Sequence, residues 1–185
     1  MDVKILRLFR KIHRTTGALL FVFFFLVSIT ALLLGWKKNS GGLILPKTSI
    51  GSSTELDKWL SIDSLHKIAI KTLHDSIDKN LSTELDRIDI RNNKGIVKFV
   101  FVDAYWEIQV DGANGNVLQI LKRKSDFIED LHDGSYLDYY FKTNGEPFKL
   151  FYTSMMGLAL FSFTVTGFWL WYGPIKLRRQ KRNVN

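Results

Sequence analysis

Four histidines are the residues whose chemistry is easiest to name in this chain: His13, His66, His74 and His132. The chain has no cysteine, which excludes disulfides, thiolate metal sites and thiol catalysis. It shows neither a nucleophile elbow around a serine nor a glycine-rich phosphate loop. Redox chemistry would therefore need a bound cofactor, and neutral imidazoles are the obvious ligands for one.

His13 and His132 are the two candidates for a site, because both are expected to lie next to predicted membrane spans. The alternative for His13 is an interfacial polar residue beside Arg14, and the alternative for His132 is a polar residue on a short helix. We expect His66 and His74 at the surface of a helix. Their spacing of eight residues is too wide for one metal ion, which favours neighbours three or four residues apart.

Two long stretches without a charged residue must position these histidines: Thr15–Trp36 and Leu150–Ile175. As a helix rising about 1.5 Å per residue, the first would be about 33 Å long, enough to cross a hydrocarbon core of about 30 Å. A cleaved signal peptide fits it less well, because such a peptide has a shorter apolar region and a small-x-small cleavage site. We predict membrane spans at 15–36 and 150–173, with Pro174 ending the second helix.

The charge of the flanks predicts the topology. Segment 1–14 has five basic residues and one acidic residue, and segment 174–185 has five basic residues and no acidic one. Since the whole chain carries +8, segment 37–149 has a net charge of −1. The positive-inside rule places the amphipathic lead-in and the basic tail in the cytoplasm and the middle segment across the lipid bilayer. Nucleic acid is not expected as a partner, because no basic stripe interleaves with aromatic residues.

The middle segment predicts a small α+β domain. Residues 37–55 are rich in glycine and serine, which indicates a linker or loosely ordered loop. Apolar residues then recur at helical spacing over 61–77, with Ser61 as N-cap. Four stretches with the character of strands follow, the first alternating apolar and polar residues and the second rich in β-forming residues, with turn residues after the first and before the last. This predicts one helix packed against an antiparallel meander within residues 56–122. The predicted strands are 85–90, 96–102, 105–110 and 117–121, and the predicted core is Leu65, Ala69, Leu73, Ile88, Phe99, Phe101 and Ile108.

Residues 123–149 are expected to form a periplasmic helix over 126–137, which contains His132, and an aromatic segment at the outer membrane interface. The predicted class is therefore a membrane protein with two transmembrane helices flanking a small α+β domain.

Three stretches carry a resemblance to a known family. His13-Arg14-Thr15-Thr16-Gly17 opens the first apolar run. The strand Tyr105–Asp111 is followed by Gly115-Asn116-Val117-Leu118. Leu131-His132 precedes Thr164–Trp171, which reads TVTGFWLW. In this order they resemble the PepSY-associated transmembrane family of bacteria, over residues 10–175. The chain departs from that family in having two predicted spans where larger members have four or more, and Thr30-Ala31 where many members have Thr-Gly.

The resemblance implies a protein of the bacterial inner (cytoplasmic) membrane with a periplasmic PepSY-like domain. Because some relatives are haem-containing reductases of siderophore-iron uptake, it implies haem b held by His13 and His132 as axial ligands. The expected function is electron transfer that assists ferric-chelate reduction, as a component of a haem-dependent ferric reductase. Whether the chain is itself an enzyme stays open, and no catalytic residue is assigned.

The two histidines are expected near opposite faces of the membrane, so one iron cannot join them. A homodimer forming a four-helix bundle would bring equivalent histidines together. The alternative function is a non-enzymatic, membrane-anchored PepSY module that binds or regulates a periplasmic protease or transporter.

Overall fold

The computed structural model describes residues 3–182. Met1, Asp2 and residues 183–185 belong to the predicted cytoplasmic ends and lie outside the described residues. The chain divides into a helical unit, residues 1–32 and 129–185, and a sheet unit, residues 33–128. Two long apolar helices at the ends of the chain thus flank a small antiparallel sheet with helices, as the sequence predicts.

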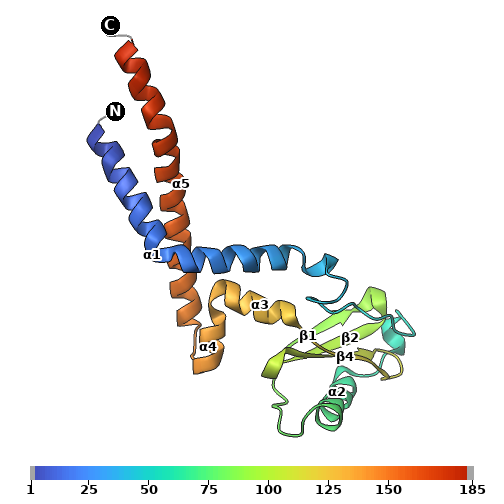
Figure 1. Cartoon of the computed structure of the whole chain (residues 1–185). Helices are drawn as coiled ribbons and strands as arrows, with labels where there is room; N and C mark the ends of the chain where they lie inside the picture. The colour runs from blue at the N-terminus through green and yellow to red at the C-terminus, as the bar shows by residue number, and fades with distance from the viewer. Residues whose placement is uncertain (1–2, 183–185) are drawn as a thin grey trace. The chain divides into compact units, whose positions relative to one another are not determined.

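The sheet unit is built from one helix and a four-stranded meander (Figure 1). The helix α2 spans Ile62–Ser76, and the Ser61 side chain accepts a hydrogen bond from the amide of Ser64, so the predicted N-cap is confirmed. The sheet order is β1-β2-β3-β4, with every neighbouring pair antiparallel. The strands are β1 (Leu85–Arg91), β2 (Ile96–Phe101), β3 (Trp106–Asp111) and β4 (Val117–Lys122), and short 3-10 helices lie at Lys37–Asn39, Leu56–Lys58, Asn92–Lys94 and Asp103–Tyr105.

The hydrophobic core lies between α2 and one face of the sheet. Its fully buried members are Leu65, Ala69, Leu73, Val97, Phe99, Phe101, Ile108 and Val110. The prediction that Ile88 belongs to this core is wrong, because its side chain is 38% exposed. Ile88 pairs with Phe99, but β1 is the edge strand and α2 packs on β2, β3 and β4. Leu85 of β1 still packs against the core, whereas Ile88 and Ile90 are exposed.

The other face of the sheet is polar and is covered by residues 44–53, which we call the strap. The Ser49 amide donates to Gln109 Oε1 at 2.8 Å, and Gln109 Nε2 donates to the carbonyl of Lys47 at 2.9 Å. Further along, the Ser52 amide donates to Asp111 Oδ2 at 2.7 Å. The expectation of a loosely ordered loop is therefore corrected: the strap has no regular structure of its own, yet its backbone is bonded to the sheet.

The helical unit consists mainly of α1 (Val3–Gly35) and α5 (Pro147–Arg182), both long and apolar enough to cross a membrane. The two helices run antiparallel. His13, early in α1, contacts Thr166 of α5. Further along α1, Phe24 and Phe23 contact Phe163 and Tyr152, which come earlier in α5. The prediction that Pro174 ends the helix is wrong. Proline removes one backbone hydrogen bond, but the helix continues to Arg182. Basic residues near a helix C-terminus stabilise it, because they interact favourably with the negative end of the helix dipole.

Two short helices take the place of the single one expected over 126–137. Helix α3 spans Lys124–Asp133 and α4 spans Ser135–Phe141. Gly134 separates them with φ of 85°, a left-handed conformation that glycine adopts without strain. A Cβ at this position would also lie 2.9 Å from Tyr152 Cβ, so the close approach to α5 needs glycine as well.

Candidate functional site

His13 lies on α1 with its ring against α5. Its Nδ1 is 2.9 Å from Thr166 Oγ1, although the two residues are 153 positions apart in the sequence. The imidazole also meets the ring of Phe163 edge-on, with centroids 4.5 Å apart. Gly167 lies beside the ring, and a Cβ there would make only an ordinary contact with His13 Cε1, at 3.7 Å. Antiparallel packing of the two apolar helices therefore builds this end of the site.

His132 repeats the arrangement with a different pair of helices. It lies in the last turn of α3, and its Nδ1 is 2.8 Å from Thr30 Oγ1 on α1. Thr30 and Thr166 are each only 4% exposed, so both hydrogen bonds are shielded from solvent on the threonine side. Each histidine named from the sequence thus contacts a buried threonine of a long apolar helix.

The two histidines belong to separate sites. Thr30, the partner of His132, follows His13 on the same helix by 17 residues, which is about 25 Å at about 1.5 Å per residue. One metal ion cannot bridge that distance. Figure 1 shows that α1 also changes direction along its length. The hydroxyls of Ser28 and Thr30 donate back to the carbonyls of Phe25 and Leu26, a pattern that bends helices.

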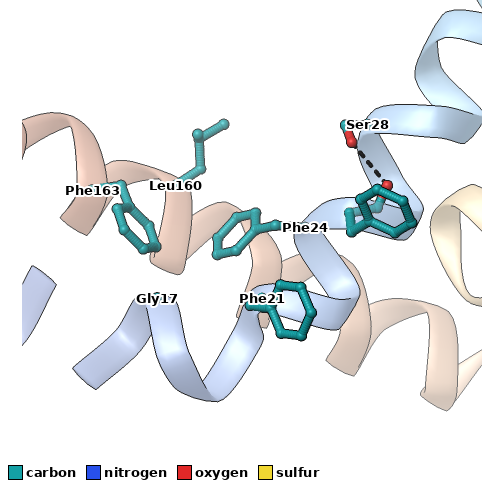
Figure 2. A pocket seen from close by; sticks show the side chains of 7 residues that line it. Gly17, Phe21, Phe24, Ser28, Leu160 and Phe163 are labelled. Carbon is teal, nitrogen blue, oxygen red and sulfur yellow. Dashed lines mark hydrogen bonds between the residues drawn. The ribbon is translucent and has the colours of Figure 1, made fainter. Parts of the chain in front are cut away.

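An apolar groove runs between α1 and α5 next to the His13 site (Figure 2). Its volume is about 490 Å³. It is lined by Gly17, Phe21, Phe24, Phe25, Ser28, Leu160 and Phe163. Ser28, the polar lining residue, bonds its hydroxyl to its own helix. Phe163 joins the groove to the site, because it contacts both His13 and Phe24. The groove is therefore an open, largely aromatic surface beside the His13 site.

His66 and His74 are half-buried, so their expected place at the surface is corrected. The His66 ring stacks on Phe99 with centroids 5.5 Å apart, and its Nε2 has no partner among the described residues. His74 Nε2 lies 3.2 Å from the carbonyl of Leu81. Both rings pack within the sheet unit and serve its structure.

The side chains around His13 and His132 limit what these two imidazoles could bind. Among residues 3–182, no group of three or more His, Asp or Glu side chains is placed to hold a metal ion. A haem brings its own equatorial nitrogens, so its iron needs only one or two protein ligands. The hydrogen bonds that the structure gives for His13 and His132 both use Nδ1. Each imidazole could therefore offer Nε2 as one ligand to a haem iron.

A polar cluster in the sheet unit was not anticipated from the sequence. Glu107 is fully buried and accepts hydrogen bonds from Lys98 at 3.3 Å, from Gln109 at 2.6 Å and from Arg123. Arg123 also donates to Asp126 at 2.8 Å. The signal in the sequence was the alternation of polar and apolar residues in β3, with Lys98 as the one polar residue of β2. Such a pattern usually marks a solvated face, but the strap covers this one.

The cluster also lowers the pKa of the Asp126 carboxyl group. Burial by itself would raise the pKa of its carboxyl group. Hydrogen bonds from Arg123, Arg87 and Ser125 favour the ionised form and outweigh burial, so the pKa lies below its usual range. The cluster is fully paired and has a structural role.

The fold and the two histidine sites define a class: a protein with two long apolar helices, a small strap-covered sheet unit and, on each long helix, a buried threonine paired with a histidine of another helix. No protein-family model matches the chain, and no curated protein or solved structure is significantly similar to it. The geometry of the sites therefore carries the functional argument.

Proposed function

We propose that this chain is a haem-binding electron-transfer protein of the bacterial inner membrane, which assists the reduction of ferric chelates such as siderophores in iron uptake. The observation that carries the proposal is the repeated arrangement of His13 and His132. In each case Nδ1 is hydrogen-bonded to a buried threonine, which leaves Nε2 as the ring nitrogen that could bind iron. A ligating histidine characteristically bonds its second ring nitrogen to a neighbouring group in this way.

The role of each residue follows from its position. Haem b, when bound, supplies a one-electron iron couple. His13 and His132 would each hold the haem iron through one imidazole nitrogen, and the aromatic groove beside His13 would offer an apolar surface to the cofactor. Because each site offers one imidazole, a second copy of the chain supplies the other ligand. A two-fold axis would give a four-helix bundle with two such sites.

The same proposal places both termini in the cytoplasm and the sheet unit in the periplasm. It is supported by the antiparallel pairing of α1 and α5, which brings the start of α1 and the end of α5 to the same end of the helical unit (Figure 1). Both of these ends carry the excess of basic residues.

An absorption spectrum of the full-length protein, purified in detergent from haem-replete cells, tests the proposal. We expect a Soret band with low-spin, bis-histidine features. His13→Ala and His132→Ala should each remove part of the haem, because the sites are about 25 Å apart along α1. The matched controls His66→Ala and His74→Ala should retain all of it. Full haem retention in the His13→Ala, His132→Ala double variant would contradict the ligand assignment.

A second candidate function is a PepSY-like module that binds a periplasmic protein. The observation in its favour is the edge strand β1, where Ile88 is 38% and Ile90 is 53% exposed. An apolar strand edge is a common site for adding a strand from a partner. Absence of any Soret band in the wild-type protein would favour this function over electron transfer.

A further inference from the structure

We infer that the hydroxyl groups of Thr166 and Thr30 fix the tautomers of His13 and His132, so that each ring carries its proton on Nδ1 and offers Nε2 to a ligand. The two threonines are positioning residues, since they act through the imidazoles. The consequence for haem rests on the proposed function, whereas the tautomers themselves are a property of the protein alone.

The direction of the hydrogen bonds follows from the threonine partners. A hydroxyl group has one hydrogen to donate and two lone pairs that accept. Thr166 Oγ1 lies 2.6 Å from the carbonyl oxygen of Ser162, and Thr30 Oγ1 lies 2.9 Å from that of Leu26. A carbonyl oxygen only accepts, so each hydroxyl hydrogen points into its own helix. The lone pairs of Oγ1 then face the imidazole, and Nδ1–H must be the donor.

Burial of the two threonines favours one tautomer of each histidine over the other. Both threonines are 4% exposed, so water has little access to replace the imidazole as their partner. An imidazole that placed its proton on Nε2 would turn the Nδ1 lone pair toward the lone pairs of Oγ1. A buried acceptor facing an acceptor is unfavourable, and the Nδ1–H tautomer avoids it.

Other threonines of the same helices show that the pairing is not a general feature. Thr153 and Thr164 on α5 are exposed, and their hydroxyls donate to the carbonyls of Lys149 and Leu160. Back-bonding to the helix is thus common to all four threonines. Burial under a histidine ring distinguishes Thr30 and Thr166, and they meet that ring from different helices.

The chain of bonds also affects the nitrogen that is left open. A carbonyl, a hydroxyl and an N–H joined in sequence polarise one another. Electron density is pushed toward the imidazole, which makes Nε2 a more basic ligand. An iron held by such a nitrogen has its ferric form favoured, so loss of the threonine hydroxyl should raise the reduction potential.

The test begins with the haem-free, full-length protein labelled with ¹⁵N-histidine in detergent micelles, at about pH 8, where ordinary imidazoles are neutral. Spectra that correlate ring protons with ring nitrogens identify the protonated nitrogen. We expect Nδ1–H for His13 and His132. Thr166→Val should change the tautomer population of His13 alone, and Thr30→Val that of His132 alone. Thr→Ser at either position should restore the wild-type signal, and the control variants Thr164→Val and Thr153→Val should alter neither.

The haem-loaded protein gives an independent readout. Each Thr→Val variant should weaken haem retention by about 10-fold or more and raise the potential of one site, with rescue by serine. Nε2–H tautomers in the wild type, or Nδ1–H populations unchanged in both valine variants, would overturn the inference. A wild-type protein without a Soret band would instead end the proposed function and leave the tautomer result standing. Unchanged circular dichroism, together with an unchanged signal from the histidine that keeps its threonine, would show that a variant is folded.

Discussion

The buried carboxylate of Glu107 offers the sharpest test of how the sheet unit is held together. We expect Glu107→Gln to lower the free energy of unfolding of this unit strongly. The change keeps the shape of the side chain but leaves Lys98 and Arg123 facing a neutral amide, with 4% and 11% of their side chains exposed. Removing one partner of a buried ion pair costs about 3–5 kcal/mol. For a unit of this size each kcal/mol lowers Tm by about 4–8 °C, so a loss of roughly 12 °C or more is expected.

Pulse proteolysis in urea measures this loss in the full-length protein, because it reports cleavage of the unfolded sheet unit while the detergent protects the long helices. Asp63→Asn is the matched control. It makes the same carboxylate-to-amide change in the Asp63–Lys67 pair, whose side chains are 71% and 74% exposed. Such a pair contributes about 0.3–0.5 kcal/mol. An equal effect of the two variants would refute the reasoning that burial makes the Glu107 cluster important.

Four further outcomes follow from the structure. The pKa of Asp126 is lowered in the folded state, so its contribution to stability is fully present above its unfolded pKa of about 3.9. The urea concentration at the unfolding midpoint should therefore decrease as the pH drops below about 4, and this decrease should be smaller in Asp126→Asn. Leu73→Asp should make the sheet unit sensitive to protease, since an unpaired buried carboxylate costs several kcal/mol, and normal resistance would contradict the core. Gly134→Ala should lower the thermal midpoint of the helical unit, because a Cβ would clash with Tyr152 and φ is 85°. A periplasm-active reporter should work when fused at Lys58, and a cytoplasm-active one there would refute the topology.

Local sequence patterns determined most of the secondary structure. The helical period and the N-cap at Ser61 predicted α2, and stretches of β-forming residues between turn residues predicted all four strands to within about two residues. The two charge-free stretches predicted the long helices. These features depend on neighbours in the chain, which is why the sequence alone reveals them.

Predictions failed where packing between distant segments decides the outcome. Ile88 has the pattern of a core residue, but its strand lies at the edge, beyond the reach of α2. Pro174 was expected to end a helix, yet a long helix tolerates the loss of one backbone bond. The glycine- and serine-rich strap was expected to be loose, but the polar face of the sheet supplies partners for its backbone.

The sequence by itself identified His13 and His132 as the candidate ligands, because it showed histidines beside stretches without charge. It did not identify Thr30 and Thr166, which look like ordinary threonines of apolar helices. Only the tertiary structure brings His13 to Thr166, 153 positions away, and His132 to Thr30, 102 positions away. A candidate ligand can therefore be recognised from the residues next to it in the sequence. The group that orients this ligand depends on the tertiary structure, because a hydrogen bond needs two atoms within about 3 Å whatever their distance along the chain.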